Sequence, residues 1–251
     1  MRGILGDRAP VAKGPCDGSW TGRWALDRGA RRLYRDAAMP ALHLAPYLEQ
    51  RARWPAEGRH ILAQFDADSV VVYQAYRPEI GLDAAARGRF GPAWSRERMS
   101  WIKPNFLWMM YRSGWAEKDG QEVVLALWLR REGFDRILAD AVPSSYDDNF
   151  ASRAQWEAAV KRSDVRLQWD PDHGPGGAPE RRRAIQLGLR GAALRSFADE
   201  WLLAVEDVTR LVRAQRDHAR APRLEALNLP AEQVYPVVDP AVAARLGLAA
   251  P

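Results

Sequence analysis

The chain has 251 residues, of which 47% are hydrophobic and 27% are charged. This length and composition exclude an intrinsically disordered or fibrous protein and allow one large domain with an ample core. The formal net charge of +5 comes almost wholly from arginine, which fits either a coding bias or attraction to an anion. No apolar run reaches about 18 residues and charge interrupts the first segment, so we expect a cytoplasmic protein without membrane span or secretory signal.

Residues 1–43 contain Gly, Pro and Arg without apolar periodicity. We expect them to be a flexible N-terminal extension or a wrongly assigned start, followed by a single α+β domain at residues 44–251. The only cysteine, Cys16, lies in this segment and has no partner for an internal disulfide. The four histidines are scattered without ligand spacing, so no metal site is expected.

Apolar runs between turn residues predict strands, and segments that begin at Pro or Ser and end before Gly predict helices. The predicted strands are residues 59–65, 69–76, 98–103, 122–131, 165–169, 183–189 and 201–208. The predicted helices are residues 46–53, 78–87, 104–112, 133–141, 153–161, 191–199 and 209–220. The first two strands should form a hairpin, and the Pro- and Gly-rich residues 170–180 a mobile loop. The pattern predicts an α+β fold with a mixed or split antiparallel sheet flanked by helices.

Polar and aromatic residues are unusually dense between Ser95 and Trp115. This segment resembles the family called domain of unknown function 4291, as do four shorter strings. These strings are Val72-Tyr73-Gln74-Ala75-Tyr76, Gln168-Trp169-Asp170-Pro171, Ile185-Gln186-Leu187-Gly188 and Val234-Tyr235-Pro236. The resemblance extends over residues 46–248 and implies family membership without an activity.

The order of the elements around residues 69–131 also resembles the split sheet of ADP-ribosyltransferases. That resemblance implies that NAD lies in a cleft between two small sheets, with an aromatic ring under the nicotinamide. Three strands would line the cleft, the first at residues 73–77, the second at residues 100–103 and the third at Gln186. The expected catalytic residues are Gln74, Ser100 and Gln186. The expected cofactor-binding residues are Tyr73, Tyr76, Arg77, Arg98, Trp101, Lys103 and Arg112.

Cleavage of the nicotinamide glycosidic bond builds positive charge on the ribose, which a carboxylate stabilises. The third strand offers Gln186 instead of a glutamate, so Glu97 or Glu122 would have to supply the acid. Without one, the pocket would bind a nucleotide and not turn it over, or transfer it by a route that needs no acid.

Lys103 and Arg112 would hold the diphosphate, the lysine as a point charge and the arginine as a fork. The alternative is a solvated charge at each helix end. The enzyme hypothesis requires Gln74, Ser100, Lys103 and Gln186 to converge around one hollow.

Two alternatives to the binding of a nucleotide or small-molecule ligand stay open. Arginines at residues 181–183 and at Arg210, Arg213, Arg216 and Arg220 predict a non-catalytic module that binds nucleic acid, although a solvated face has the same pattern. Some of the eleven tryptophans could instead be buried against a second copy. The oligomeric state therefore stays open.

Overall fold

Two apolar runs form the centre of the fold. β4 (Ser69–Tyr76) and β6 (Val123–Arg130) pair antiparallel along their whole length. β10 (Leu202–Asp207) pairs antiparallel with the other edge of β6 and completes a three-stranded sheet. Both faces of this sheet are covered by apolar side chains, so β4 and β6 are nearly continuous Val and Leu runs without alternating polar residues.

The second sheet has five strands and is built on a long hairpin. β8 and β9 pair antiparallel from Val165 opposite Leu189 to His173 opposite Pro179. β7 pairs parallel with β8, whereas β2 and β5 pair with opposite ends of the other edge of β9. The bounds are β2 (Gly58–Arg59), β5 (Ser100–Ile102), β7 (Ala141–Pro143), β8 (Val165–His173) and β9 (Pro179–Leu189).

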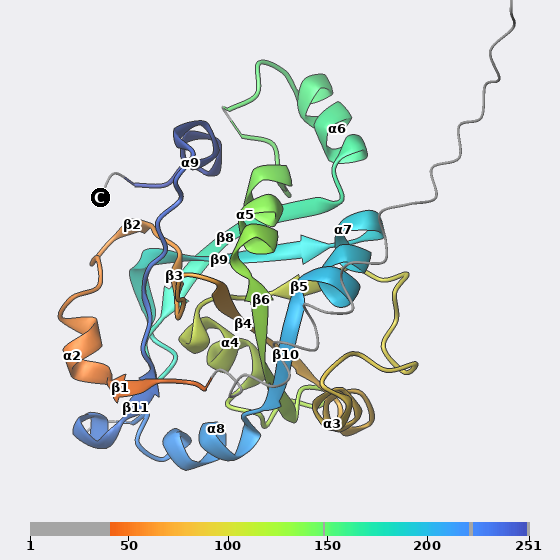
Figure 1. Cartoon of the computed structure of the whole chain (residues 1–251). Coiled ribbons are helices and arrows are strands. Elements are labelled where there is room, and N and C mark those ends of the chain that lie inside the picture. The colour runs from red at the N-terminus through yellow and green to blue at the C-terminus, as the bar shows by residue number, and fades with distance from the viewer. Residues whose placement is uncertain (1–40, 148, 221–222, 250–251) are drawn as a thin grey trace, which may run out of the picture. The chain divides into compact units, whose positions relative to one another are not determined.

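One backbone bridge joins the two sheets. The amide of Tyr73 in β4 donates to the carbonyl of Lys103 at 2.7 Å, and the amide of Lys103 donates to the carbonyl of Tyr73 at 3.2 Å. Because β5 also pairs with β9, the segment that ends at Lys103 lies between the sheets. In Figure 1 the strands of the first sheet run across those of the second. The α+β class with a split sheet is therefore confirmed.

The helices surround these sheets, and local signals set several of their ends. Asn105, Ser152 and Asp239 accept backbone N–H groups at three helix starts. Gly88, Gly114 and Gly247 end helices in the left-handed conformation. The helices are α2 (Tyr47–Arg51), α3 (Pro78–Arg87), α4 (Phe106–Ser113), α5 (Arg131–Asp140), α6 (Arg153–Arg162), α7 (Gly191–Ser196), α8 (Thr209–Arg216) and α9 (Pro240–Leu246), with a short π-helix at Phe197–Trp201 and a short 3-10 helix at Arg223–Ala226.

The structure, a computed structural model, describes residues 41–147, 149–220 and 223–249. The segment predicted as an extension, residues 1–43, lies outside them except for its last three residues. The described residues all belong to one compact unit. No helix in the described ranges is long and apolar enough to cross a membrane. Four short strands complete the fold, β1 (Leu44–Pro46), β3 (Leu62–Ala63), β11 (Asn228–Pro230) and β12 (Gln233–Val234), paired as β1 with β11 and β3 with β12.

Two predictions about the strands are wrong in part. The strand expected at 59–65 is divided between β2 and β3, which pair with β9 and β12, so only a bridge between Phe65 and Val70 remains of the expected hairpin. The loop expected at 170–180 is mostly strand, because Asp170 and Pro171 pair with β9 and only residues 174–178 connect β8 to β9. The prolines of this segment predicted a loop, but pairing between β8 and β9 makes most of it strand.

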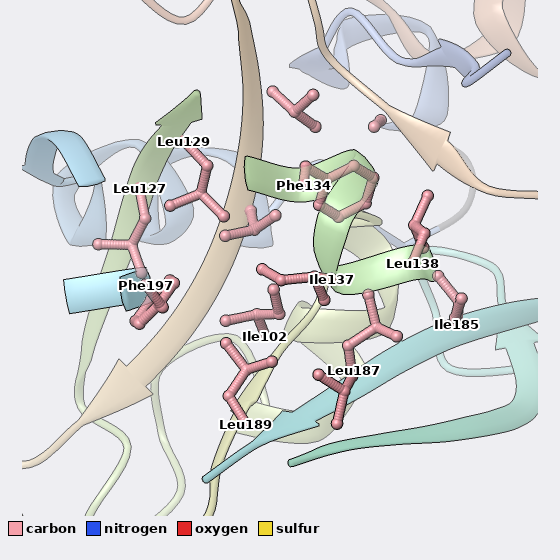
Figure 2. Close-up of a cluster of buried hydrophobic side chains, with 14 of the residues drawn as sticks. Ile102, Leu127, Leu129, Phe134, Ile137, Leu138, Ile185, Leu187, Leu189 and Phe197 are labelled. Atoms are coloured by element: carbon pink, nitrogen blue, oxygen red, sulfur yellow. The ribbon is translucent and has the colours of Figure 1, made fainter. Parts of the chain in front are cut away.

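The hydrophobic core has two parts, one on each face of the three-stranded sheet. Figure 2 shows the larger part, in which Phe134, Ile137 and Leu138 of α5 pack between Leu127 and Leu129 of β6 and the leucines of β9. The smaller part contains α4 together with Tyr73 and Trp128. The first part covers one face of the five-stranded sheet and leaves the polar side chains of β8 and β9 on the other.

Close packing between α5 and the π-helix that ends at Trp201 leads to a stability prediction. A Cβ atom at Gly133 would lie 2.3 Å from Cγ of Trp201. Gly133→Ala should therefore lower the free energy of unfolding by about 1–3 kcal/mol, because the indole has to shift. Urea unfolding followed by circular dichroism measures the change.

Gly176→Ala is the control for this substitution, since its added Cβ would come no closer than 3.8 Å to the nearest atom, the carbonyl oxygen of Ala219. Equal unfolding midpoints for the two variants would contradict the packing argument.

Candidate functional site

The five-stranded sheet has one apolar face and one polar face. Alternation along the hairpin places Leu167 and Leu187 in the core and Gln168 and Gln186 on the opposite face. Ile102 pairs with Leu187, so the residue after it, Lys103, falls beside Gln186. We call the polar face the set Trp101, Lys103, Gln168, Asp170 and Gln186.

Asp170 is the carboxylate of the polar face. Nε2 of Gln168 donates to its Oδ1 at 2.7 Å, and Nε2 of Gln186 donates to its Oδ2 at 2.6 Å. The side chain stays partly exposed. Two amides from neighbouring strands therefore hold this carboxylate in a defined orientation while solvent still reaches it.

Lys103 is the buried cation of the polar face. The residue is only 5% exposed, yet its ammonium forms no hydrogen bond or ion pair with any described residue. Burial and, to a smaller extent, the charge of Arg112 lower the pKa of Lys103 to about 8, and the charge of Asp170 opposes the change. A buried ammonium without a partner is unfavourable in the free protein, so the position is suited to receive an anion.

Trp101 is a flat ring on the polar face. It pairs across the sheet with Gly188, and a Cβ atom at Gly188 would lie 3.0 Å from the Trp101 ring and 2.7 Å from Sδ of Met99. Glycine is therefore required at position 188 for the indole to lie against the strand. The ring remains partly exposed.

Helix α4 follows Lys103 directly and is anchored at its first turn. The carboxylate of Glu232 accepts the backbone amide of Phe106 at 2.6 Å and Nδ2 of Asn105 at 3.2 Å. Burial raises the pKa of Glu232 well above its ordinary value, and the bond from the Phe106 amide opposes this. This anchor orients α4 so that Arg112, in its last turn, acts on the charge of Lys103.

An aromatic stack joins α4 to the end of β8. The rings of Tyr111 and His173 are parallel with centroids 3.5 Å apart, and Trp108 lies parallel to both. Tyr111 is 49% exposed. Nε1 of Trp108 is buried and has no hydrogen-bond partner in the described part of the chain. One exposed ring, that of Tyr111, therefore lies on the same helix as Arg112 and is backed by the buried rings of Trp108 and His173.

Gln74, Tyr76 and Ser100 form a separate network on the other side of β5. Nε2 of Gln74 donates to Oγ of Ser100 at 2.7 Å, and the Tyr76 hydroxyl donates to Oε1 of Gln74 at 2.9 Å. Nε1 of Trp94 donates to the Tyr76 hydroxyl at 2.9 Å. Burial raises the pKa of Tyr76 to about 12, with hydrogen bonds from Ser100 and Trp94 opposing this, so the hydroxyl stays protonated.

Strand β5 therefore separates the predicted site residues into two groups. Gln74 and Ser100 are hydrogen-bonded to each other on the core side, whereas Lys103 and Gln186 are neighbours on the polar face. The reason is strand parity, since Ser100 and Lys103 are an odd number of residues apart and point to opposite faces. The four residues do not surround one hollow.

The remaining predicted residues are dispersed. Tyr73 is fully buried in the smaller core part, and burial raises its pKa well above the ordinary value. Arg77 is exposed and lies 3.6 Å from Glu79. Arg98 is exposed, as is Glu97, one of the expected acids.

The other expected acid, Glu122, accepts the amide of Gly120 at 2.9 Å. Asp170, which sequence reasoning missed as an acid, takes the position next to Gln186. The alternation Gln168-Trp169-Asp170 was the signal that could have found it.

Comparison with known proteins gives a family. The model described as domain of unknown function (DUF4291) matches residues 60–235. The chain belongs to this family. The matched part of this DUF4291 chain contains all five residues of the polar face together with Arg112. A search of curated proteins gave no match.

The arginines of the two predicted clusters in the DUF4291 chain differ in their surroundings, and Arg220 is exposed. Arg181 pairs with Glu57, Arg182 is buried against Asp172, and Arg183 donates to the carbonyl of Trp169. On α8, Arg216 pairs with Glu117, whereas Arg210 and Arg213 are exposed. In the described ranges, no group of three or more His, Cys, Asp or Glu side chains is placed to hold a metal ion.

Proposed function

We propose that the DUF4291 chain binds NAD, or a closely related nucleotide, on its polar face and transfers the ADP-ribosyl group without the participation of Gln74 and Ser100. The four-residue site expected from the sequence is not formed, so it carries no function here. The observation that carries this proposal is Lys103, a residue only 5% exposed whose ammonium has no partner among the described residues. A buried charge of this kind costs stability unless a ligand anion compensates it. A negatively charged ligand bound next to Lys103 would offset this cost.

Lys103 and Arg112 are the two groups that would hold the diphosphate. Lysine provides a compact point charge, and arginine provides a fork of N–H donors that matches phosphate oxygens. The mutual repulsion that lowers the pKa of Lys103 is relieved when an anion lies near both cations. The pair therefore favours a ligand with more than one negative charge.

The rings of the polar face and of α4 suit the flat parts of a nucleotide. Trp101 lies against Gly188 beside Lys103 and keeps part of its face accessible. Tyr111 presents a half-exposed ring on the same helix as Arg112. Aromatic side chains stack on planar heterocycles at small entropic cost.

Asp170 supplies the carboxylate that the transfer requires. The bond between the ribose carbon and the nicotinamide nitrogen breaks, and its electron pair leaves with nicotinamide. The positive charge that develops on the ribose is stabilised by a nearby carboxylate, and an acceptor then adds to the same carbon with loss of its proton. In this mechanism Gln168 and Gln186 are positioning residues, because each donates a hydrogen bond to Asp170.

Lys103→Met tests the binding part of the proposal. We expect the affinity for NAD, measured by isothermal titration calorimetry, to fall at least about tenfold because a charge-assisted contact is lost. The melting temperature should stay equal or rise, because the substitution also removes an unpaired buried charge. If Lys103 had only a structural role, Lys103→Met would leave the affinity for NAD unchanged and lower the melting temperature.

Lys118→Met is the matched control, since Lys118 is an exposed lysine outside the polar face. Equal affinities of the two variants, or no heat of binding at millimolar NAD in the unchanged chain, would remove the proposal.

The affinity for NAD should also depend on pH. The pKa of Lys103 is about 8, so the ammonium is charged at pH 7 and loses its proton as the pH rises through 8. We expect binding to weaken progressively between pH 7 and pH 9.5 in calorimetric titrations. In Lys103→Met the same titrations should show a flat profile over that range, and a slope equal to that of the unchanged chain would count against Lys103.

A further inference from the structure

A hollow lies at one end of the five-stranded sheet. Its volume is about 630 Å³, and α5, α6, α7, α9 and the edge strand β7 contribute to its walls. Figure 1 shows α5, α6 and α7 near the same end of β8 and β9. None of the residues that line it belongs to the polar face. The size is within the range of about 300–1,000 Å³ that is usual for small-molecule sites.

Small side chains leave this space open. Five alanines contribute to the walls, namely Ala139, Ala141, Ala159, Ala192 and Ala193. The indole of Trp201 forms another part of the wall and is partly exposed there. Gly133 allows that indole to pack against α5, because any Cβ at this position would overlap it. The lining therefore combines a flat aromatic surface with small apolar groups.

The charges around the hollow leave an excess of positive donors. Asp140 pairs with Arg136 at 2.8 Å. Asp164 accepts the amide of Ala192 at 2.8 Å and lies 3.5 Å from Arg190. Both carboxylates in the lining are thus already matched by donors.

Two other arginines in the lining have donors to spare. Arg162 forms no hydrogen bond or ion pair with any residue the structure describes. Arg245 donates only to the carbonyl of Ala139 among those residues. These guanidinium groups come from α6 and α9, two elements that are far apart in the sequence. Their convergence on one hollow provides forked donors for an oxyanion.

We propose that this hollow binds a small planar organic acid. The flat apolar part lies against Trp201 and the alanines, and the carboxylate is held by Arg162 and Arg245. Arginine binds a carboxylate through two parallel hydrogen bonds, which accounts for its use at a site where a planar anion is recognised. This site is independent of NAD binding on the polar face.

Calorimetric titration of the full chain with 2-naphthoate and with its uncharged analogue 2-naphthamide tests the proposal. We expect saturable 1:1 binding of 2-naphthoate and at least about tenfold weaker binding of 2-naphthamide. Arg162→Met should reduce this preference for the acid, because the unpaired guanidinium is lost and only Arg245 remains to hold the carboxylate. Arg195→Met is the matched control on an exposed position of α7, and it should leave both affinities unchanged.

A second variant tests the space and leaves the charge in place. Ala192 is exposed and lines the hollow, so Ala192→Phe should fill the space and weaken both probes without removing an arginine. NAD affinity should stay unchanged in Arg162→Met and Ala192→Phe, which separates this site from the polar face. Equal affinities for acid and amide in the unchanged chain, or a preference for the acid that Arg162→Met leaves unchanged, would overturn the proposal.

Discussion

Replacing Asp170 by asparagine should lower the rate of nicotinamide release from NAD by about 10²–10³-fold, which is the usual effect of removing one group that stabilises transition-state charge. The affinity for NAD should change much less, since Lys103 and Arg112 hold the diphosphate. The rate is measured by chromatographic detection of nicotinamide at saturating NAD. This expectation depends on the proposed function and tests its chemical step separately from binding.

Asp119→Asn is the control for this substitution, because Asp119 is an exposed carboxylate on a turn. It should leave the rate unchanged. The melting temperature of Asp170→Asn shows whether the variant is folded, and a Gln186→Leu variant should reduce the rate to an intermediate degree by loosening the carboxylate. If Asp170→Asn releases nicotinamide as fast as the unchanged chain, Asp170 has no role in the transfer.

The second large effect concerns stability. Arg182 and Asp172 form a buried ion pair with side chains 7% and 1% exposed, and Nε of Arg182 lies 2.8 Å from Oδ2 of Asp172. Arg182 also donates to the carbonyl of Pro55 at 2.6 Å and lies over the ring of Trp54. Arg182→Met should lower the free energy of unfolding by about 3–5 kcal/mol, because it leaves a buried carboxylate uncompensated. Urea unfolding at pH 7 measures the loss.

The loss should depend on pH in a defined direction. Burial raises the pKa of Asp172 above its ordinary value, and Arg182 opposes this rise. Without Arg182 the rise becomes larger. A carboxyl group with a higher pKa in the folded than in the unfolded state costs stability as the pH increases through the interval between the two values. The deficit of Arg182→Met should therefore shrink between pH 7 and pH 4.5.

Arg181→Met is the adjacent control. Arg181 pairs with Glu57, but their side chains are 83% and 62% exposed, and such surface pairs contribute little. Its unfolding midpoint should be the same as that of the unchanged chain. A similar loss in both variants, or a deficit for Arg182→Met that does not vary with pH, would refute the explanation by an uncompensated charge.

Much of the local structure could be predicted because its causes are local. The apolar runs of β4 and β6 are long enough to be recognised without knowledge of their partners. Pro78 begins α3 and Gly88 ends it in the left-handed conformation, as both residue types require. Short strands were harder, because two or three residues carry little pattern. β2 and β3 exist only because β9 and β12 pair with them.

The candidate site could be predicted only in part, because its residues come from segments far apart in the chain. The dense segment around Trp101, Lys103 and Arg112 pointed to the correct region of the chain as a candidate. Ser100 and Lys103 were predicted to belong to one site because they are close along the chain. The prediction was wrong because their side chains point to opposite faces. Asp170 was assigned to a loop, so its approach to Gln186 across the hairpin could not be anticipated.

The sequence by itself determined the α+β class, the two long central strands, the helix ends at glycine and proline, and membership of the DUF4291 family. The structural features depend on residues close together in the chain, and the family depends on sequence motifs in a fixed order. Only the tertiary structure decided which polar residues meet. Cross-strand pairing brings Gln168, Asp170 and Gln186 together and leaves Lys103 buried without a partner, and such register depends on hydrogen bonds between segments far apart in the chain.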